Sequence, residues 1–264
     1  MSSLSNRARI PPEELVPLLS RRYIEGLTQG PFFTAKEFVP EHYMPSDWTL
    51  NDLEGRSDDW PFNILVQPKP DDLQQRRGYK NHVVVAVDGE CTRNGEANAS
   101  GGIGIFVREG SMHNVSQTLP GMVCGQQIKS QRAGLMASAV ALLHLLDLKR
   151  IEPALRGVER VIIKSDSAYL VKGMTLWMNV WKMNGFKTMT GVGGRPVKNA
   201  ELFKVVGRAV RLVQKRLDCE VFFWRVGRQW NPHANALATH WHRARQYQWG
   251  RQWHRGRQSD HLRR

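Results

Sequence analysis

The chain has 264 residues, of which 41% are hydrophobic and 23% are charged, as is typical of a folded protein with one or two domains. Its net charge of +14 favours a polyanionic partner, with nucleic acid as the first candidate. No apolar run approaches the roughly 20 residues that span a bilayer, so we expect no membrane partner.

Cysteine usage and the N-terminus bear on the compartment. Three cysteines are too few, and odd in number, for a disulfide framework, which favours a reducing environment. The polar start of the chain lacks the hydrophobic stretch of a secretory signal. We therefore expect an intracellular protein, nuclear or cytoplasmic.

Charge is distributed unevenly along the chain. Residues 1–80 contain 10 basic and 12 acidic residues, whereas residues 81–264 contain 28 and 12. The last stretch, 243–264, has seven arginines and one aspartate. We therefore expect the polyanion to bind the C-terminal two thirds of the molecule.

Residues 1–80 are rich in proline and other turn formers and are predicted to be an irregular N-terminal extension. A helix is plausible over 13–26. The rest has aromatic anchors, such as Phe32-Phe33 and Trp60-Pro61-Phe62. The extension either wraps around the following domain or is partly disordered.

From residue 82 onwards, hydrophobic periodicity predicts alternating strands and helices. The apolar run 82–88 predicts a strand buried on both faces. After it we expect a hairpin of 101–108 and 112–119, a helix over 130–148, a strand at 161–164, a helix over 167–182, a helix capped by Asn199 and ending at Leu217, a strand at 220–226, and a helix from Pro232 to about Tyr247. This order predicts an α/β fold with a mixed sheet and flanking helices.

Two acids follow apolar strands in this scheme, Asp88 and Asp166. Sites in open α/β sheets lie beyond the carboxyl ends of strands. Paired carboxylates there suggest divalent-metal chemistry on phosphates. The alternative is that both acids are ordinary turn residues.

Several segments together resemble the type 1 ribonuclease H family. They are Asp88-Gly89, Ser130-Gln131-Arg132-Ala133-Gly134-Leu135, Lys164-Ser165-Asp166-Ser167, the stretch from Gly173 to Asn199, and Val226 to Ala238 with its Arg228-Gln229-Trp230-Asn231 core. The resemblance covers about residues 82–245 in the family's order. It implies a ribonuclease H-like domain over 81–245 with a five-stranded mixed sheet, followed by a basic Arg/Trp-rich tail at 246–264.

The resemblance implies a nuclease that cuts the RNA strand of an RNA–DNA hybrid with two Mg²⁺ ions held by four carboxylates. Asp88 and Asp166 match two of these carboxylates. Gly134 and Asn235 stand where the family has glutamate and aspartate. Because Mg²⁺ needs well-placed hard anions, we expect Mg²⁺ (or Mn²⁺) to bind weakly if at all, and cleavage to be lost or weak.

Two further residues bear on this expectation. Glu90 lies two residues after Asp88, on the same face of an extended chain, and would be a substitute ligand unless it is a solvated turn residue. His233 would be a proton shuttle unless it is a solvated histidine on a helix.

Nucleic-acid binding is better preserved than catalysis in this comparison. Gln131 matches a position that contacts 2′-hydroxyls in the RNA minor groove. The family's basic protrusion corresponds to Trp177, Lys182, Lys187, Lys198 and Asn199, with Arg195 adding charge. Trp181 is interpreted as a helix-packing residue.

The tail interleaves Trp249 and Trp253 with arginines, which suits single-stranded RNA or DNA or, alternatively, docking of the tryptophans on the domain. Three functions stay open at this point: a monomeric hybrid-binding protein without cleavage, an active Mg²⁺-dependent ribonuclease H, and a non-catalytic scaffold. Hybrid binding and cleavage assays separate them.

Overall fold

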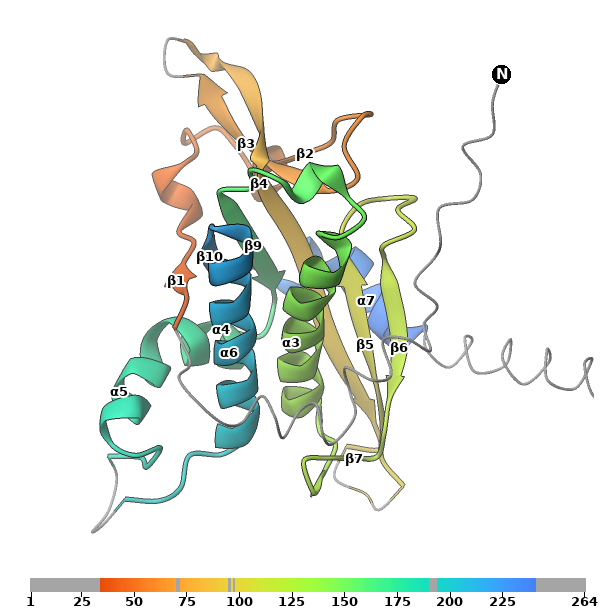
Figure 1. The fold of residues 1–264 in the computed structure, drawn as a ribbon, viewed down its shortest axis with the longest axis vertical. Helices are drawn as coiled ribbons and strands as arrows, with labels where there is room; N and C mark the ends of the chain where they lie inside the picture. Colours follow the sequence, from red (N-terminus) through yellow and green to blue (C-terminus); the bar gives the residue numbers. More distant parts are fainter. Residues whose placement is uncertain (1–33, 70–71, 95, 97, 190–193, 241–264) are drawn as a thin grey trace, which may run out of the picture.

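A computed structural model describes residues 34–69, 72–94, 96, 98–189 and 194–240 (Figure 1). The helix expected over 13–26 and the tail at 246–264 lie outside these residues, so both stay predictions. Within the described part, α7 (Pro232–Thr239) forms the last helix, which was expected to continue to about Tyr247.

Eight of the described strands form one mixed sheet. In spatial order these are β1 (Lys36–Glu37), β10 (Glu220–Arg225), β9 (Arg160–Ser165), β4 (Asp72–Thr92), β3 (Asn63–Lys69) and β2 (Glu54–Gly55), with β5 (Ser100–Phe106) and β6 (Val115–Leu119) added beside β4. The first four run parallel to one another, and all other pairings in the sheet are antiparallel. The predicted mixed α/β class is confirmed.

Strand β4 is much longer than the predicted strand 82–88. Its C-terminal part pairs with β5 over 86–92, and its N-terminal part pairs with β3 over 72–84. This hairpin of β3 and β4 projects from the body at the top of Figure 1. Residues 75–78 are exposed there, so they lack the apolar alternation that would mark them as a strand.

The predicted hairpin is confirmed, but its strands β5 and β6 are shorter at the turn end than expected. The side chain of Asn114 accepts a hydrogen bond from the amide of Val107 at 2.8 Å and donates to the carbonyl of Arg108 at 2.7 Å. These bonds replace ladder bonds, so the turn opens before residue 108. Gly110 has a φ of 69°, which glycine adopts without strain.

One face of the sheet, here called the first face, is covered by α3 (Ser130–Leu148) and α6 (Ala200–Leu217), which stand in front of the strands in Figure 1. Val83, Val85 and Val87 of β4 pack into this core. A helical segment made of α4 (Ala168–Lys172), the π-helical turn Gly173–Trp177 and α5 (Met178–Met183) leads away from the sheet. These helices lie where periodicity predicts them.

The opposite face, here called the second face, is covered by α7 and by N-terminal residues. Phe38, Trp48 and Leu53 pack against Val84 of β4 and Trp224 of β10. The short helices of this covering are Pro40–His42 and Leu50–Leu53. Residues 34–69 therefore complete the core of the domain, which agrees with the wrapping alternative for this part of the extension.

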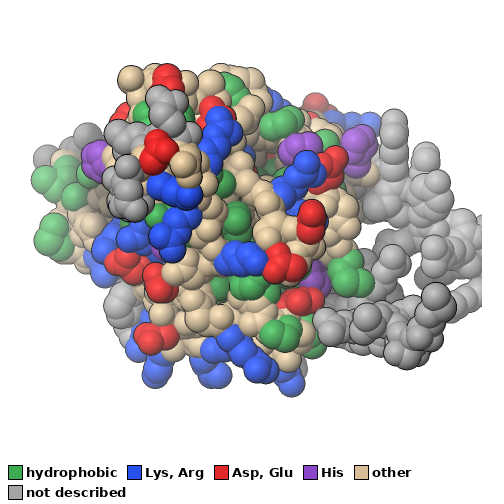
Figure 2. All heavy atoms as spheres, turned by 90° about the horizontal axis from the view of Figure 1, so that it is seen from above, with side chains coloured by type: hydrophobic (Ala, Val, Ile, Leu, Met, Phe, Trp, Pro, Cys, Tyr) green, Lys and Arg blue, Asp and Glu red, His purple; other side chains and the backbone are tan. Residues whose placement is uncertain are grey.

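Surface charge at one end of the molecule is mixed. Viewed from the end that carries the β3–β4 hairpin, basic and acidic side chains are interspersed (Figure 2). Arg76 pairs there with Asp52 at 2.6 Å, and Lys80 pairs with Asp59 at 2.6 Å. Across the part of the chain that the structure describes, no helix is both long and apolar enough to cross a membrane.

Candidate active site and nucleic-acid interface

The predicted pair of carboxylates meets at one edge of the sheet. Strands β4 and β9 are parallel neighbours with Ala86 opposite Lys164. Two residues further along each strand direction lie Asp88 and Asp166, which therefore lie next to each other at this edge of the sheet. The carboxylates are close enough for Asp166 to raise the pKa of Asp88. The topology thus joins two acids that are 78 positions apart in the sequence.

Burial, charges and hydrogen bonds act in opposite directions on the pKa of Asp88. Burial raises the pKa of its carboxyl above the ordinary value, and the negative charge of Asp166 raises it further. Hydrogen bonds from the side chain of Asn235 and the amide of Gly89, each at 2.8 Å, act in the opposite direction, as does the positive charge of Arg228.

Asn235, on α7, presents its amide nitrogen to Asp88. Its Nδ2 donates to Asp88 Oδ2 at 2.8 Å. An ionised carboxylate only accepts hydrogen bonds, so the amide must turn its nitrogen, and not its oxygen, towards Asp88. Asn235 therefore contributes a neutral hydrogen-bond donor to Asp88 and no second negative charge.

Asn231 connects the same acids to the start of α7. Its Nδ2 donates to the carbonyl of Val87 at 3.0 Å and lies 3.4 Å from Asp166 Oδ1. Asn231 is the N-cap residue of α7, but its side chain makes no capping hydrogen bond. Asn231 and Arg228 were missed as site residues, although both lie in the segment that carries the family resemblance.

Gly134, on α3, lies where the helix crosses close over β4. A Cβ added to Gly89 would lie 2.2 Å from the backbone nitrogen of Gly134, so the two backbones are in direct contact. A Cβ added to Gly134 itself would meet no heavy atom within 4 Å. The position therefore has room for a side chain that the sequence does not supply.

Glu90 lies on the same face of β4 as Asp88, as the extended spacing predicts, because the two residues face Gly102 and Gly104 across the ladder. One oxygen of its carboxylate is buried without a hydrogen-bond partner. However, Glu90 is not among the charges that shift the pKa of Asp88. The role of substitute ligand stays a prediction.

The donor set does not fit a pair of magnesium ions. Among the described residues, no three histidine, cysteine, aspartate or glutamate side chains form a group that could hold a metal ion. Two carboxylates face each other, and Asn235 turns an N–H towards one of them. Mg²⁺ requires well-placed hard anions, and Gly134 and Asn235 leave the site with two fewer negative charges than the family pattern supplies.

The basic protrusion presents its lysines to solvent. Lys182, Lys187 and Lys198 are all exposed, and Gln131 is exposed at the start of α3. Within the protrusion, Lys187 and Pro196 form an isolated antiparallel β-bridge. These side chains are available to contact a phosphate backbone.

Trp177 and Trp181 contact each other and neighbouring aromatic rings, and both are half-buried. The ring of Trp181 meets Phe203 edge-on at 5.0 Å, in agreement with its interpretation as a packing residue. Trp177 lies 5.8 Å from Trp181 and 6.1 Å from Tyr169, and it is half-buried. Trp177 thus keeps part of its side chain exposed.

Asn199 precedes α6 as predicted, but it does not cap the helix. Its φ is +57°, and its side chain makes no capping hydrogen bond. Instead Oδ1 accepts from Arg132 at 3.0 Å, while Nδ2 lies 3.2 Å from the hydroxyl of Tyr169. The residue is 4% exposed. Asn199 therefore ties α6 to α3 through Arg132, which leaves its side chain little access to a nucleic acid.

His233 stacks on Phe106 with ring centroids 4.5 Å apart and an interplanar angle of 15°. It is exposed at the start of α7, as the alternative of a solvated helix histidine assumed. Its role as a proton shuttle stays a prediction.

Comparison with known proteins defines the family. The family model for RNase H matches residues 80–221, which is more than half of the chain. The chain belongs to the RNase H family. The matched region includes β4 from residue 80 onwards, α3, β9 and the protrusion, and with them Asp88, Gly134 and Asp166. Asn235 lies beyond it.

Individual relatives match this RNase H chain at moderate identity. Human ribonuclease H1 is 32% identical over 145 residues, which cover 54% of this chain and 45% of the relative. Ribonuclease H of Marinobacter nauticus is 37% identical over 123 residues, covering 46% and 69%. Mouse ribonuclease H1 is 31% identical over 109 residues, covering 41% and 34%. The chain thus spans about a third to a half of the length of these mammalian relatives.

Among solved structures, LC11-RNase H1 in complex with an RNA/DNA hybrid matches at 20% identity with a TM-score of 0.39, covering 59% of this chain and 93% of the other. RNase H1 of Halobacterium salinarum matches at 19% identity with a TM-score of 0.37, covering 61% and 96%.

Proposed function

We propose that this RNase H-family chain binds RNA–DNA hybrid, or a related duplex, and has lost most or all of the family's cleavage of the RNA strand. The observation that carries the proposal is the contact between Asn235 and Asp88. In this contact a neutral amide donates to Asp88 where the family pattern has a further carboxylate, and Gly134 supplies no side chain where the pattern has a glutamate, although a Cβ there would meet no heavy atom within 4 Å.

Retained binding is supported by the surface. Lys182, Lys187 and Lys198 are exposed on the protrusion, and the net charge is +14. Such residues attract a phosphate backbone whether or not the carboxylates can hold metal ions, so binding can outlast catalysis.

The binding experiment measures the affinity of the full chain for a labelled RNA–DNA hybrid by fluorescence anisotropy over a series of salt concentrations. We expect affinity to fall steeply, with a log–log slope of about −0.9 for each neutralised phosphate. Lys187→Ala should reduce the slope by about one contact. Lys215→Ala, which removes an exposed lysine near the end of α6, is the matched control. A flat slope for the unaltered chain would refute the electrostatic account.

A second binding variant tests recognition of RNA itself. Gln131→Ala should lower the preference for hybrid over double-stranded DNA more than it lowers the affinity for both, because the matched position contacts a sugar hydroxyl. An equal loss on the two duplexes would assign Gln131 a structural role.

An active ribonuclease H is the second candidate, and the buried, unpartnered oxygen of Glu90 favours it. In that case the unaltered chain cleaves hybrid in Mg²⁺ or Mn²⁺, and Glu90→Gln abolishes the cleavage. Cleavage that survives Asp88→Asn would come from a contaminating nuclease.

A further inference from the structure

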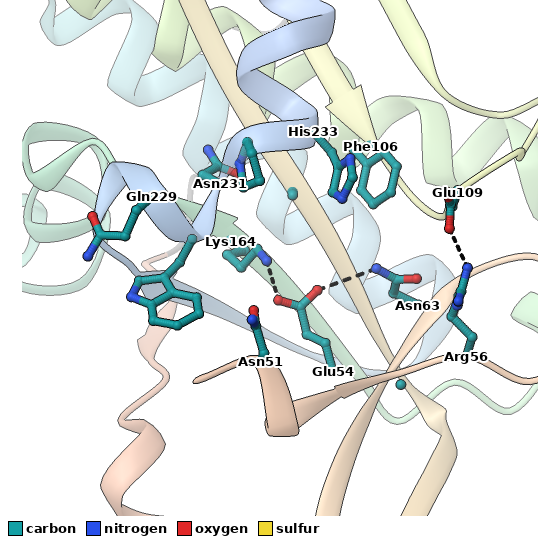
Figure 3. A pocket seen from close by; sticks show the side chains of 14 residues that line it. Asn51, Glu54, Arg56, Asn63, Phe106, Glu109, Lys164, Gln229, Asn231 and His233 are labelled. Carbon is teal, nitrogen blue, oxygen red and sulfur yellow. Dashed lines mark hydrogen bonds and ion pairs between the residues drawn. The ribbon is translucent and has the colours of Figure 1, made fainter. Parts of the chain in front are cut away.

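A polar cavity of about 400 Å³ lies on the second face of the sheet, between the N-terminal covering and the start of α7 (Figure 3). Its walls come from the helix Leu50–Leu53, β2 and β3 on one side, and from β4, β9 and the residues that open α7 on the other. The first set lies outside the region that matches the RNase H family model. The cavity therefore exists because this chain adds residues 34–69 to the sheet.

The charged groups of the cavity are already paired. The ammonium of Lys164, a residue 8% exposed, forms an ion pair with Glu54. Arg56 pairs with Glu109 at the rim. Figure 3 shows Glu54 between Lys164 and Asn63 in the middle of the cavity. Since two positive and two negative side chains offset one another, the cavity suits an uncharged ligand rather than a phosphate.

Two amide oxygens in the walls lack a partner. Asn231 is 1% exposed and its Oδ1 accepts no hydrogen bond. Its orientation is fixed, because Nδ2 donates to the carbonyl of Val87 at 3.0 Å. Asn63 likewise has a buried Oδ1 without a partner, while its Nδ2 lies 3.4 Å from Glu54. Each of these oxygens has less than 1 Å² of accessible surface, so a ligand that brings N–H donors satisfies them only when neighbouring side chains move aside.

Aromatic rings complete the walls. His233 is stacked on Phe106 in a nearly parallel arrangement, with centroids 4.5 Å apart, and the pair lines the cavity with Trp230. Ring surfaces favour a flat ligand, because aromatic faces stack in offset geometry. Bases of nucleic acids bind to proteins in this way irrespective of sequence.

We propose that this cavity binds a nucleobase: an uncharged, planar ring that carries N–H donors on its edge. Guanine fits the donor requirement best, because it has N–H groups on two neighbouring atoms, N1 and N2. The base would come either from a free nucleoside or from an unpaired nucleotide in a bound strand. The cavity shares Asn231 with the carboxylate site, but a nucleoside can occupy it in the absence of a hybrid, so the proposal does not depend on hybrid binding.

The test titrates guanosine and inosine into the full chain and follows binding by calorimetry and by the side-chain amide signals of ¹⁵N-labelled protein. We expect guanosine to bind, with shifts of the Asn63 and Asn231 amides, and inosine, which lacks the N2 amino group, to bind at least tenfold more weakly. Because both ligands are used on the unaltered chain, this comparison is independent of whether a variant folds.

Variants locate the site. Asn63→Leu removes one unpartnered oxygen and should weaken guanosine binding about tenfold. Asn98→Leu changes an exposed asparagine of the β4–β5 turn that does not line the cavity, and should leave binding unchanged. Equal effects of the two variants would overturn the assignment to this cavity.

A second titration distinguishes the source of the base. It compares a fully paired RNA–DNA hybrid with one that contains a single unpaired guanosine. Tighter binding of the second, lost in Asn63→Leu, assigns the cavity to a base of a bound strand. Binding of guanosine without this difference assigns it to a free nucleoside. If neither guanosine nor the unpaired base has any effect, the proposal is wrong, whether or not the chain binds hybrid.

Discussion

The two faces of the sheet are built in different ways. The first face is a core of mainly aliphatic side chains from α3, α6 and the strands, with a few buried polar residues such as Arg132 and His144. The second face combines an apolar cluster around Trp224 with a buried lysine, a buried asparagine and a polar cavity. Both faces stabilise the domain through apolar packing, but of the two the second opens a polar cavity, whose buried polar groups cost stability unless a partner satisfies them.

The largest loss of stability is expected at the contact between β4 and α3, where the first face meets the candidate site. In Gly89→Ala, the new Cβ would lie 2.1 Å from the carbonyl carbon of Ala133. Because backbone atoms cannot move aside cheaply, we expect a loss of more than about 3 kcal/mol in the free energy of unfolding, or no soluble protein. Urea denaturation followed by circular dichroism measures this. A Gly89→Ala variant as stable as the unaltered chain would show that α3 does not press on β4.

The next largest effect concerns the second face. Leu53 is fully buried in the N-terminal covering, so Leu53→Ala should lower the free energy of unfolding by about 2–5 kcal/mol. Leu176, which is 60% exposed, is the matched control, and Leu176→Ala should change stability by less than about 0.5 kcal/mol. If both substitutions are equally mild, residues 34–69 are an appendage and not part of the core.

A buried histidine on the first face predicts a pH dependence. Burial lowers the pKa of His144 to about 4 from an ordinary value of 6.5. The unfolded chain therefore binds the proton more tightly, and stability is full above about pH 6.5 and falls as the pH drops towards 4. The loss amounts to at most about 3 kcal/mol. His82, with a pKa also lowered to about 4 by burial, contributes in the same direction.

The measurement is the free energy of unfolding across this range, for the unaltered chain and for His144→Gln. The variant keeps a side-chain N–H for the carbonyl of His113, which His144 Nε2 now contacts at 3.1 Å. Its stability should depend less steeply on pH. Identical profiles would mean that His144 is hydrated and not buried in solution.

The smallest expected effect is at Gly134. Because a Cβ there meets no heavy atom within 4 Å, Gly134→Ala should raise the free energy of unfolding by about 0.5–1 kcal/mol through helix propensity alone. The sign is opposite to that of Gly89→Ala, although the two glycines are neighbours in space. A Gly134→Ala variant that is less stable than the unaltered chain would show that the space is not available to a side chain.

The elements of the first face are those that periodicity predicts. The helix over 130–148 and the strand at 161–164 have strong apolar patterns, and Asp88 and Asp166 follow from strand order. The covering of the second face was not predicted in detail, because Phe38, Trp48 and Leu53 lie on irregular chain with no period. The polar β3–β4 hairpin was missed for the same reason.

The candidate site, too, was predicted only in part from the sequence. The sequence identifies Asn235 as a replaced residue, but only the structure shows that its amide donates to Asp88. Similarly, Asn199 was predicted at the right place, before α6, yet its side chain bonds to Arg132 and not to the helix. Spacing predicts which residues are near one another, whereas hydrogen-bond direction depends on tertiary packing.

The central claim is that the carboxylate site has lost its capacity for metal-dependent cleavage while the fold around it is intact. The most direct measurement is cleavage of a labelled RNA–DNA hybrid in Mg²⁺ by the unaltered chain and by the double variant Gly134→Glu, Asn235→Asp. We predict little or no cleavage by the first and clear cleavage by the second, since the double variant restores four negative charges around the site. Strong cleavage by the unaltered chain that is abolished by Glu90→Gln, or a folded, hybrid-binding double variant that stays inert, would contradict the account.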